Sequence, residues 1–339
     1  MESEISVALC ADKNVEVSLH VTLYSLLKSS QHPIKINLVQ KGYTSGDIDK
    51  IHLTLQQFPD KYQLNVIKFD ENALFGKFKG LHGNQFNFTK LILANVLSDD
   101  RIIYLDSDLA IGKDLSELFS TNLNDFVIGA SAIETISDSL RSTFYQSIGM
   151  KKEAKYFNSG VMLMDLKKWR ELDITSQCLS FGNKYVDRVS FGDEAILNCI
   201  FYENFQTIDA SYNHPLYPDS ALVQLNSLNE IFHFVGSPKP FDFLGEFIHP
   251  NYAMFYDSLT QTIFRDYRSY LDFSFAKSKR TANLLRSYYN LLKKKIDYQL
   301  TSTTSAIESP VNISSGEAKK RLARTVNDNW QFSSRTDIK

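Results

Sequence analysis

Along the first 240 residues or so of this 339-residue chain, short continuous apolar runs alternate with stretches in which apolar residues recur at helical spacing. Short apolar runs rich in strand-forming residues predict strands at 5–11, 34–40, 62–69, 102–106, 126–132 and 160–166. Apolar side chains recur at helical spacing at 17–30, 47–58, 85–97 and 194–201. Because strands and helices alternate in the first part of the chain, the pattern is typical of a parallel sheet flanked by helices.

The pattern changes near residue 276. Residues 276–296 contain seven Lys or Arg and no acid, and their apolar side chains fall on one helical face, which predicts a basic amphipathic helix. After Leu300 the chain is rich in Ser and Thr, which predicts a mobile tail. We therefore expect a folded domain over 1–275, the basic helix within 276–300 and the tail over 301–339.

Composition narrows the function classes. The formal net charge of −2 excludes a chain that binds polyelectrolytes over its whole surface. Cys10, Cys178 and Cys199 are far apart and odd in number, which predicts neither a disulfide framework nor a zinc site. The N-terminus lacks the basic start of a signal peptide, and no apolar run reaches the ~18 residues of a membrane span. We expect a cytoplasmic protein.

Two acids, Asp106 and Asp108, end a strand predicted to be buried. Removing a carboxylate from water costs several kcal/mol unless a cation, proton or donor replaces that water. Acids at this spacing can share Mg²⁺ or Mn²⁺ with the phosphate oxygens of a nucleoside diphosphate. Two alternatives remain open: a turn capped by Asp106, and a phosphatase in which Asp106 is a nucleophile. Phosphatases of the haloacid-dehalogenase type have the motif DxDx[TV]. Here Leu109 and Ala110 follow the pair, so the position of Thr or Val is occupied by Ala, which argues against this alternative.

Other motifs accompany the acid pair in a fixed order. They are CADKN (10–14), FNSGVMLMDLKKWR (157–170), FGDEAILN (191–198) and HFVGSPKPF (233–241). With the acid pair they resemble the family 8 glycosyltransferases, retaining enzymes that include glycogenin and the bacterial lipopolysaccharide galactosyl- and glucosyltransferases. The resemblance spans about Ile5 to Phe241. It implies an α/β fold of the GT-A type, with a mixed, mostly parallel central sheet, flanking helices and a C-terminal helical extension.

The resemblance also implies a metal and nucleotide site. Asp106, Asp108 and His233 would bind Mn²⁺, with Mg²⁺ as the alternative, against the diphosphate of a UDP-sugar. Gly236 would let the backbone approach the phosphates, and Lys239 would bind them as a point charge. The remaining nucleotide contacts implied by the motifs are Ala11, Asp12, Asn14 and Ser107.

The donor sugar would lie over Asn158 and Ser159, with Asp193 bonded to its hydroxyls. Lys90 stands where the family usually has an Arg that reaches the donor. Glu194 stands where many bacterial members have Gln, and the resemblance places it on the β-face of the sugar. It would there act either as a nucleophile or as a charge that stabilises the transition state.

The implied activity is retaining transfer of a hexose from a UDP-sugar to a glycan, glycolipid or glycoprotein, such as a lipid-linked bacterial cell-surface glycan. The competing prediction is a non-catalytic module that binds sugar nucleotides or glycans. For 276–296 we favour peripheral contact with the cytoplasmic face of an anionic membrane over a helix packed on the domain. A nucleic-acid partner is not expected, because no aromatic platform alternates with the basic residues.

Overall fold

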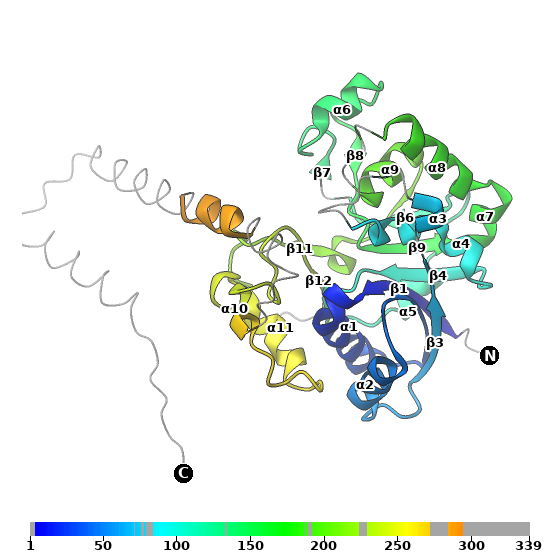
Figure 1. The fold of residues 1–339 in the computed structure, drawn as a ribbon. Helices are drawn as coiled ribbons and strands as arrows, with labels where there is room; N and C mark the ends of the chain where they lie inside the picture. Colours follow the sequence, from blue (N-terminus) through cyan, green and yellow to red (C-terminus); the bar gives the residue numbers. More distant parts are fainter. Residues whose placement is uncertain are drawn as a thin grey trace, which may run out of the picture. The chain divides into compact units, whose positions relative to one another are not determined.

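The computed structural model of the protein describes residues 4–70, 72–75, 78, 84–132, 134–186, 188, 192–223, 229–271 and 284–293 (Figure 1). The chain divides into two units, residues 1–287 and 288–339. All the motifs named above belong to the first unit.

A seven-stranded sheet forms the centre of the first unit. Its strands, in spatial order, are β10 (Gln206–Thr207), β6 (Ile128–Ala130), β9 (Val161–Asp165), β4 (Arg101–Leu105), β1 (Ile5–Asp12), β2 (Ile34–Lys41) and β3 (Tyr62–Lys68). Neighbouring strands from β4 to β3 are parallel, and β9 runs antiparallel to both β4 and β6. The predicted mixed, mostly parallel sheet is confirmed.

Both faces of this sheet are covered by helices, because side chains along a strand point alternately to opposite sides. Leu9 of β1 packs in a core that also contains residues of α1 (Glu16–Ser29) and α2 (Ser45–Leu55). Ala8 packs in the opposite core, with residues of α7 (Leu166–Glu171), α8 (Ile174–Lys184) and α9 (Asp193–Ile200). Figure 1 shows α1 and α2 separated from α7, α8 and α9 by the sheet.

One predicted helix has a different form. Residues 85–97 were expected to be a regular helix, but the structure has a 3₁₀ helix, η2 (Phe86–Ile92), followed by α4 (Leu93–Val96). Almost every side chain of η2 is buried, so the segment lacks the polar face that marks a surface α-helix. The remaining short elements are η1 (Lys13–Val15), α3 (Asn72–Phe75), α5 (Ser116–Ser120), α6 (Ser142–Ser147), η3 (Ala210–Tyr212), α10 (Gly245–Ile248), α11 (Tyr252–Leu259) and η5 (Ser269–Leu271).

A second sheet joins distant parts of the sequence. It contains β11 (His214–Leu216), β12 (Ile231–Phe234) and β5 (Leu109–Ile111), and a separate pair is formed by β7 (Glu134–Thr135) and β8 (Lys155–Tyr156). Strand β5 begins directly after Asp108, and its Leu109 is paired with His233 of β12. The hydroxyl of Thr22 in α1 bonds both backbone groups of Leu109, which fixes β5 against the main core.

Residues 284–293 are helical and lie within the range predicted for the basic helix. The rest of that prediction, 276–283 and 294–296, and the predicted tail over 301–339 lie outside the described residues. Within the described parts of the chain, none of the helices combines the length and apolar character needed to cross a bilayer.

Candidate active site

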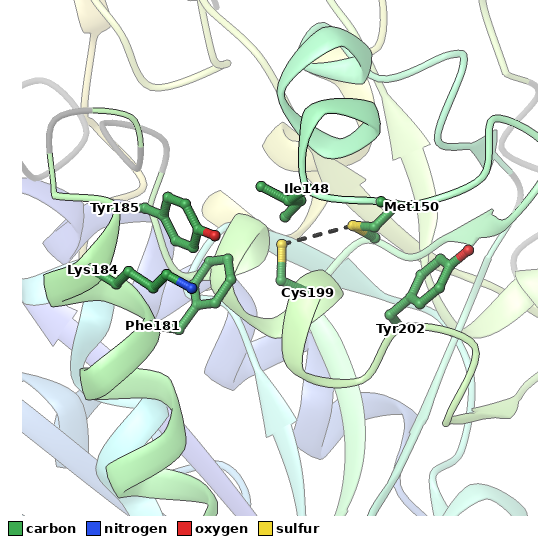
Figure 2. Close-up of a pocket in the computed structure, with 8 residues that line it drawn as sticks. Ile148, Met150, Phe181, Lys184, Tyr185, Cys199 and Tyr202 are labelled. Carbon is green, nitrogen blue, oxygen red and sulfur yellow. Dashed lines mark hydrogen bonds between the residues drawn. The ribbon is translucent and has the colours of Figure 1, made fainter.

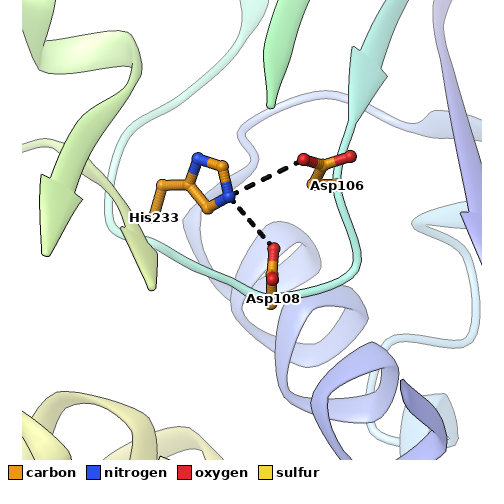
Figure 3. A group of neighbouring side chains, drawn as sticks. All are labelled: Asp106, Asp108 and His233. Carbon is orange, nitrogen blue, oxygen red and sulfur yellow. Dashed lines mark ion pairs between the residues drawn. The ribbon is translucent and has the colours of Figure 1, made fainter. Parts of the chain in front are cut away.

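Asp106, Asp108 and His233 converge as the motifs predicted (Figure 3). Asp106 follows β4, Asp108 precedes β5 and His233 lies on β12. Nε2 of His233 is 3.2 Å from Oδ1 of Asp108 and 3.6 Å from Oδ2 of Asp106. Two carboxylate oxygens and one imidazole nitrogen thus face a common point, an arrangement that suits a divalent metal ion.

Hydrogen bonds leave Nε2 of His233 available as a metal ligand. Nδ1 lies 3.0 Å from Oδ1 of Asn158 and 3.1 Å from Oδ1 of Asn213. Oδ1 of Asn158 also accepts from the backbone N–H of Gly160, which identifies it as the amide oxygen. Nδ1 therefore carries a proton, and Nε2 is the nitrogen directed toward the two acids.

One carboxylate oxygen of Asp106 is hydrogen-bonded to the protein, and the other faces the candidate metal position. Oδ1 accepts hydrogen bonds from Tyr104 at 2.6 Å and from Lys90 at 3.0 Å. Oδ2 faces His233. The hydrogen bonds to Oδ1 therefore orient the carboxylate, so that Oδ2 is the free ligand.

Asp108 is held in a similar way. Its Oδ2 accepts from Lys239, whose ammonium also donates to the carbonyl of Phe234 at 2.7 Å. Burial alone would raise the pKa of Asp108, but the charges of Lys239 and His233 outweigh it and hold the pKa below the ordinary range. Oδ1 is buried and makes no hydrogen bond within the described part of the chain. A divalent metal would supply the missing partner of this acceptor, and the residues present fit such a metal.

Lys90 links the metal site to the predicted sugar site. Its ammonium contacts Asp106, lies 2.7 Å from Oδ2 of Asp193 and donates to the hydroxyl of Ser159 at 3.2 Å. Burial lowers the pKa of Lys90, but the two neighbouring acids more than compensate and raise it above its ordinary value. Lys90 is therefore a permanent cation between two carboxylates.

Glu194 contacts the amide nitrogen of Asn158, whose amide oxygen contacts His233. Its Oε2 accepts from Nδ2 of Asn158 at 3.0 Å and from the backbone N–H of Ser159 at 3.3 Å. Its Oε1 accepts from the hydroxyl of Tyr156 at 2.6 Å. Burial raises the pKa of the Glu194 carboxyl, and the Tyr156 hydrogen bond opposes that shift. Asn158 therefore contacts both His233 and Glu194.

The predicted nucleoside residues gather at the ends of β1 and β4. The carboxylate of Asp12 caps η1 by accepting from the backbone N–H of Asn14 at 2.8 Å, and it accepts from Nδ2 of Asn84 at 2.6 Å. Ala11 is buried beside it, and the hydroxyl of Ser107 donates to the carbonyl of Cys10 at 3.0 Å. The structure therefore brings these predicted residues to one edge of the sheet.

Gly236 has a φ of +79°, a conformation that favours glycine, in the loop between His233 and Lys239. A Cβ at this position would lie 3.7 Å from the ring of Tyr217. Tyr217 is 39% exposed, and its hydroxyl donates to Glu134 at 3.3 Å. An accessible aromatic ring therefore borders the loop that is predicted to bind the phosphates.

The motifs did not point to Tyr104, Tyr156, Asn84, Asn213 or Tyr217. Tyr104 could have been found, because it lies two residues before Asp106 and therefore on the same side of the strand. Tyr156 directly precedes the FNSG motif. Asn84 and Asn213 lie in polar segments without periodicity, so no signal in the sequence identifies them.

A separate cavity of about 220 Å³ lies at the opposite end of α9 from Glu194 (Figure 2). Its lining residues are Ile148, Gly149, Met150, Phe181, Lys184, Tyr185, Cys199 and Tyr202. None of these described lining residues carries a carboxylate, and the thiol of Cys199 lies 3.9 Å from the thioether of Met150. The cavity therefore lacks the metal ligands and paired charges of the site around Asp106.

Solved structures confirm the fold class. The galactosyltransferase LgtC in complex with donor and acceptor sugar analogs is similar with a TM-score of 0.64 and 22% identity, over 76% of this chain and 96% of LgtC. The glycosyltransferase GlyE of Streptococcus pneumoniae TIGR4 is similar with a TM-score of 0.57 and 22% identity, over 76% of this chain and 61% of GlyE. At these identities the similarity establishes the GT-A fold.

Sequence comparison identifies the family. This chain is 28% identical to glycosyltransferase GlyF of Streptococcus pneumoniae serotype 4 (strain ATCC BAA-334 / TIGR4) over 62% of its own length and 48% of GlyF, so it spans about half of that relative. It is 23% identical to general stress protein A of Bacillus subtilis (strain 168), over 69% of this chain and 86% of that protein. The profile of Glycosyl transferase family 8 matches residues 6–244, and the chain therefore belongs to that family.

Proposed function

We propose that the protein transfers a hexose from a UDP-sugar to a glycan, glycolipid or glycoprotein, with retention of configuration and with Mn²⁺ at Asp106, Asp108 and His233. The observation that carries this proposal is the convergence of one ligand atom from each of these three side chains. The second polar atom of Asp106 and of His233 is already hydrogen-bonded to the protein, which leaves the first to bind a metal. A bound divalent metal would supply positive charge against the diphosphate. Mg²⁺ is the alternative metal.

The nucleotide lies along the loop that carries Gly236 and Lys239. The ammonium of Lys239 is close to Asp108, so a diphosphate at the metal position is within its reach. It would stabilise the negative charge on the departing UDP as a point charge. Asp12 and Asn14 receive the nucleoside, and the polar groups that they already pair with hold them in position.

The sugar lies over Asn158, Ser159 and Asp193, whose polar atoms can bond its hydroxyls. Glu194 then faces the reacting carbon from the β-face. There its carboxylate stabilises the positive charge that develops as the bond to UDP breaks, or attacks that carbon. A trapped covalent glycosyl-Glu194 would establish attack.

For localisation, we propose a cytoplasmic protein that contacts an anionic membrane through 276–296. The helical residues 284–293 support this proposal, because Leu285, Tyr289 and Leu292 are each more than half exposed. These side chains follow the i, i+4, i+7 spacing of one helical face. A membrane location suits a lipid-linked cell-surface acceptor. Nucleic acid is not expected as a partner.

Release of UDP from a panel of UDP-hexoses tests the proposal. With Mn²⁺ and at least one donor, we expect release that stops when the metal is chelated. Replacing the metal ligand in Asp108→Asn should lower the rate about 100-fold or more, since several kcal/mol of charge stabilisation are lost. Asp257→Asn is the matched control, because Asp257 is an exposed acid whose ion pair with Lys28 lies on the surface. Binding of UDP-hexose without release from any donor would favour the non-catalytic module.

A further inference from the structure

Helix α6 and the β7–β8 pair contribute no ligand to the metal position, yet they supply two tyrosines next to Glu194. Tyr156 of β8 is paired with Glu134 of β7 and is 9% exposed. Tyr145 of α6 is fully buried. The hydroxyl of Tyr145 donates to that of Tyr156 at 3.4 Å, and Tyr156 donates to Oε1 of Glu194 at 2.6 Å.

The direction of these hydrogen bonds follows from the chemistry of the groups. An ionised carboxylate only accepts, so Tyr156 uses its single proton for Glu194 and its oxygen accepts from Tyr145. Burial raises the pKa of both phenols above their ordinary values, so both remain protonated and able to donate. The two hydroxyls thus form a chain that ends on the carboxylate.

The hydrogen bond from Tyr156 also fixes the position of Oε1 of Glu194. The other oxygen, Oε2, is held by Asn158 and Ser159. A carboxylate held at one oxygen can still rotate about that contact, whereas contacts at both oxygens set its plane. The short bond from Tyr156 therefore determines the orientation of Glu194.

We propose that Tyr156 is a positioning residue that holds Glu194 as an oriented carboxylate toward the donor sugar, with Tyr145 fixing the direction of the Tyr156 hydroxyl. The inference rests on the proposed function for its catalytic consequence. It assigns a role to α6 and the β7–β8 pair, which lie between β6 and β9 in the sequence. The alternative is that both rings only fill the core.

Tyr156→Phe separates these roles, because it keeps the ring and removes only the hydroxyl. We expect kcat for UDP release to fall about ten-fold, the value of a hydrogen bond to a charged group, while the KM for the donor changes less than about two-fold. Tyr145→Phe should lower kcat by a smaller factor. Tyr202→Phe is the matched control, since its hydroxyl accepts from the backbone of Lys151 and lies at the other end of α9.

A double substitution tests whether Tyr156 acts through Glu194. In a Glu194→Ala background, Tyr156→Phe should cause no further loss of kcat, because the group it positions is absent. A loss as large as in the wild-type background would overturn the inference. So would equal kcat values for Tyr156→Phe and Tyr202→Phe. Thermal melting of each variant verifies that it is folded.

A second measurement does not depend on activity. The carboxyl resonance of Glu194, in protein labelled with ¹³C-glutamate and assigned with Glu194→Gln, reports its ionisation. Removing a donor to the charged form should raise the pKa of Glu194 in Tyr156→Phe but not in Tyr202→Phe. The substitution leaves the other titratable groups near Glu194 in place, namely Lys90, Arg141, Tyr145, Asp193 and Tyr217.

The two readouts distinguish the possible failures. A raised pKa without cleavage of any sugar nucleotide would contradict the proposed function and leave the positioning contact established. An unchanged pKa in an active protein would overturn the positioning role alone.

Discussion

Asp106 and His233 each offer one atom to the protein and one to the metal position. Oδ1 of Asp106 is bonded to Lys90 and Tyr104, and Nδ1 of His233 is close to the amide oxygens of Asn158 and Asn213. Because these contacts fix both side chains, the remaining ligand atoms need little ordering when a cation binds. Affinity for the metal should therefore depend on residues that never touch it.

Asn213 provides a test at this scale. It is 2% exposed and contacts both His233 and Asn158. We expect Asn213→Ala to weaken Mn²⁺ binding about 10- to 100-fold, the usual effect of losing a hydrogen-bond partner behind a metal ligand. Calorimetric titration of Mn²⁺ measures this change. Asn183→Ala, on the exposed surface of α8, is the control, and equal affinities for the two variants would contradict the role of Asn213.

At the scale of elements, the site depends on the approach of β12 to the start of β9. Gly160, directly before β9, lies under the ring of His233, where an added Cβ would be 2.3 Å from Cε1 and 2.5 Å from Nδ1. Its carbonyl also accepts from the backbone N–H of Asp106 at 2.8 Å. The absence of a side chain at this position allows His233 to reach the two acids.

Gly160→Ala should therefore displace the imidazole and abolish both Mn²⁺ binding and UDP release. Because Cβ contacts below 3.0 Å force the backbone or the imidazole to move, the substitution introduces strain. We therefore also expect a melting temperature below that of the wild type. Gly46→Ala is the matched control. Gly46 lies in α2, where the nearest atom to an added Cβ is 3.9 Å away, so this change should be tolerated. Retained metal affinity in Gly160→Ala would show that the contact does not hold His233.

Strand ends were predictable from the sequence, whereas contacts between distant loops were not. The continuous apolar run before Asp106 placed this acid at the end of β4, and the HFVGSPKPF motif pointed to His233. The pairing of β12 with β5, which brings His233 to Asp108, joins segments more than 100 residues apart and leaves no local pattern. The 3₁₀ form of η2 was also missed. Its apolar side chains recur at helical spacing, but the polar side chains of Thr89 and Lys90 are buried with them, and the sequence does not reveal this burial.

At the scale of the whole molecule, charge is distributed unevenly. The formal net charge is −2, but 276–296 contains seven basic residues and no acid, so the rest of the chain has a formal charge of −9. An anionic surface would repel most of the protein and attract this segment. The described helix 284–293 also exposes Leu285, Tyr289 and Leu292, which can add apolar burial to that attraction.

Vesicle flotation tests whether the segment acts as a membrane contact. We expect the full chain to float with vesicles that contain phosphatidylserine and to remain unbound with neutral phosphatidylcholine, and binding should weaken as salt rises because charge attraction is screened. Leu285→Ser combined with Leu292→Ser should reduce flotation by about ten-fold or more, since two buried leucines contribute about 3 kcal/mol or more together. Leu140→Ser is the matched control, because Leu140 is fully exposed in a loop of the first unit. If the double variant floats as well as the control, the exposed leucines of 284–293 do not enter the membrane. Equal flotation with neutral and anionic vesicles would exclude the charge-based contact.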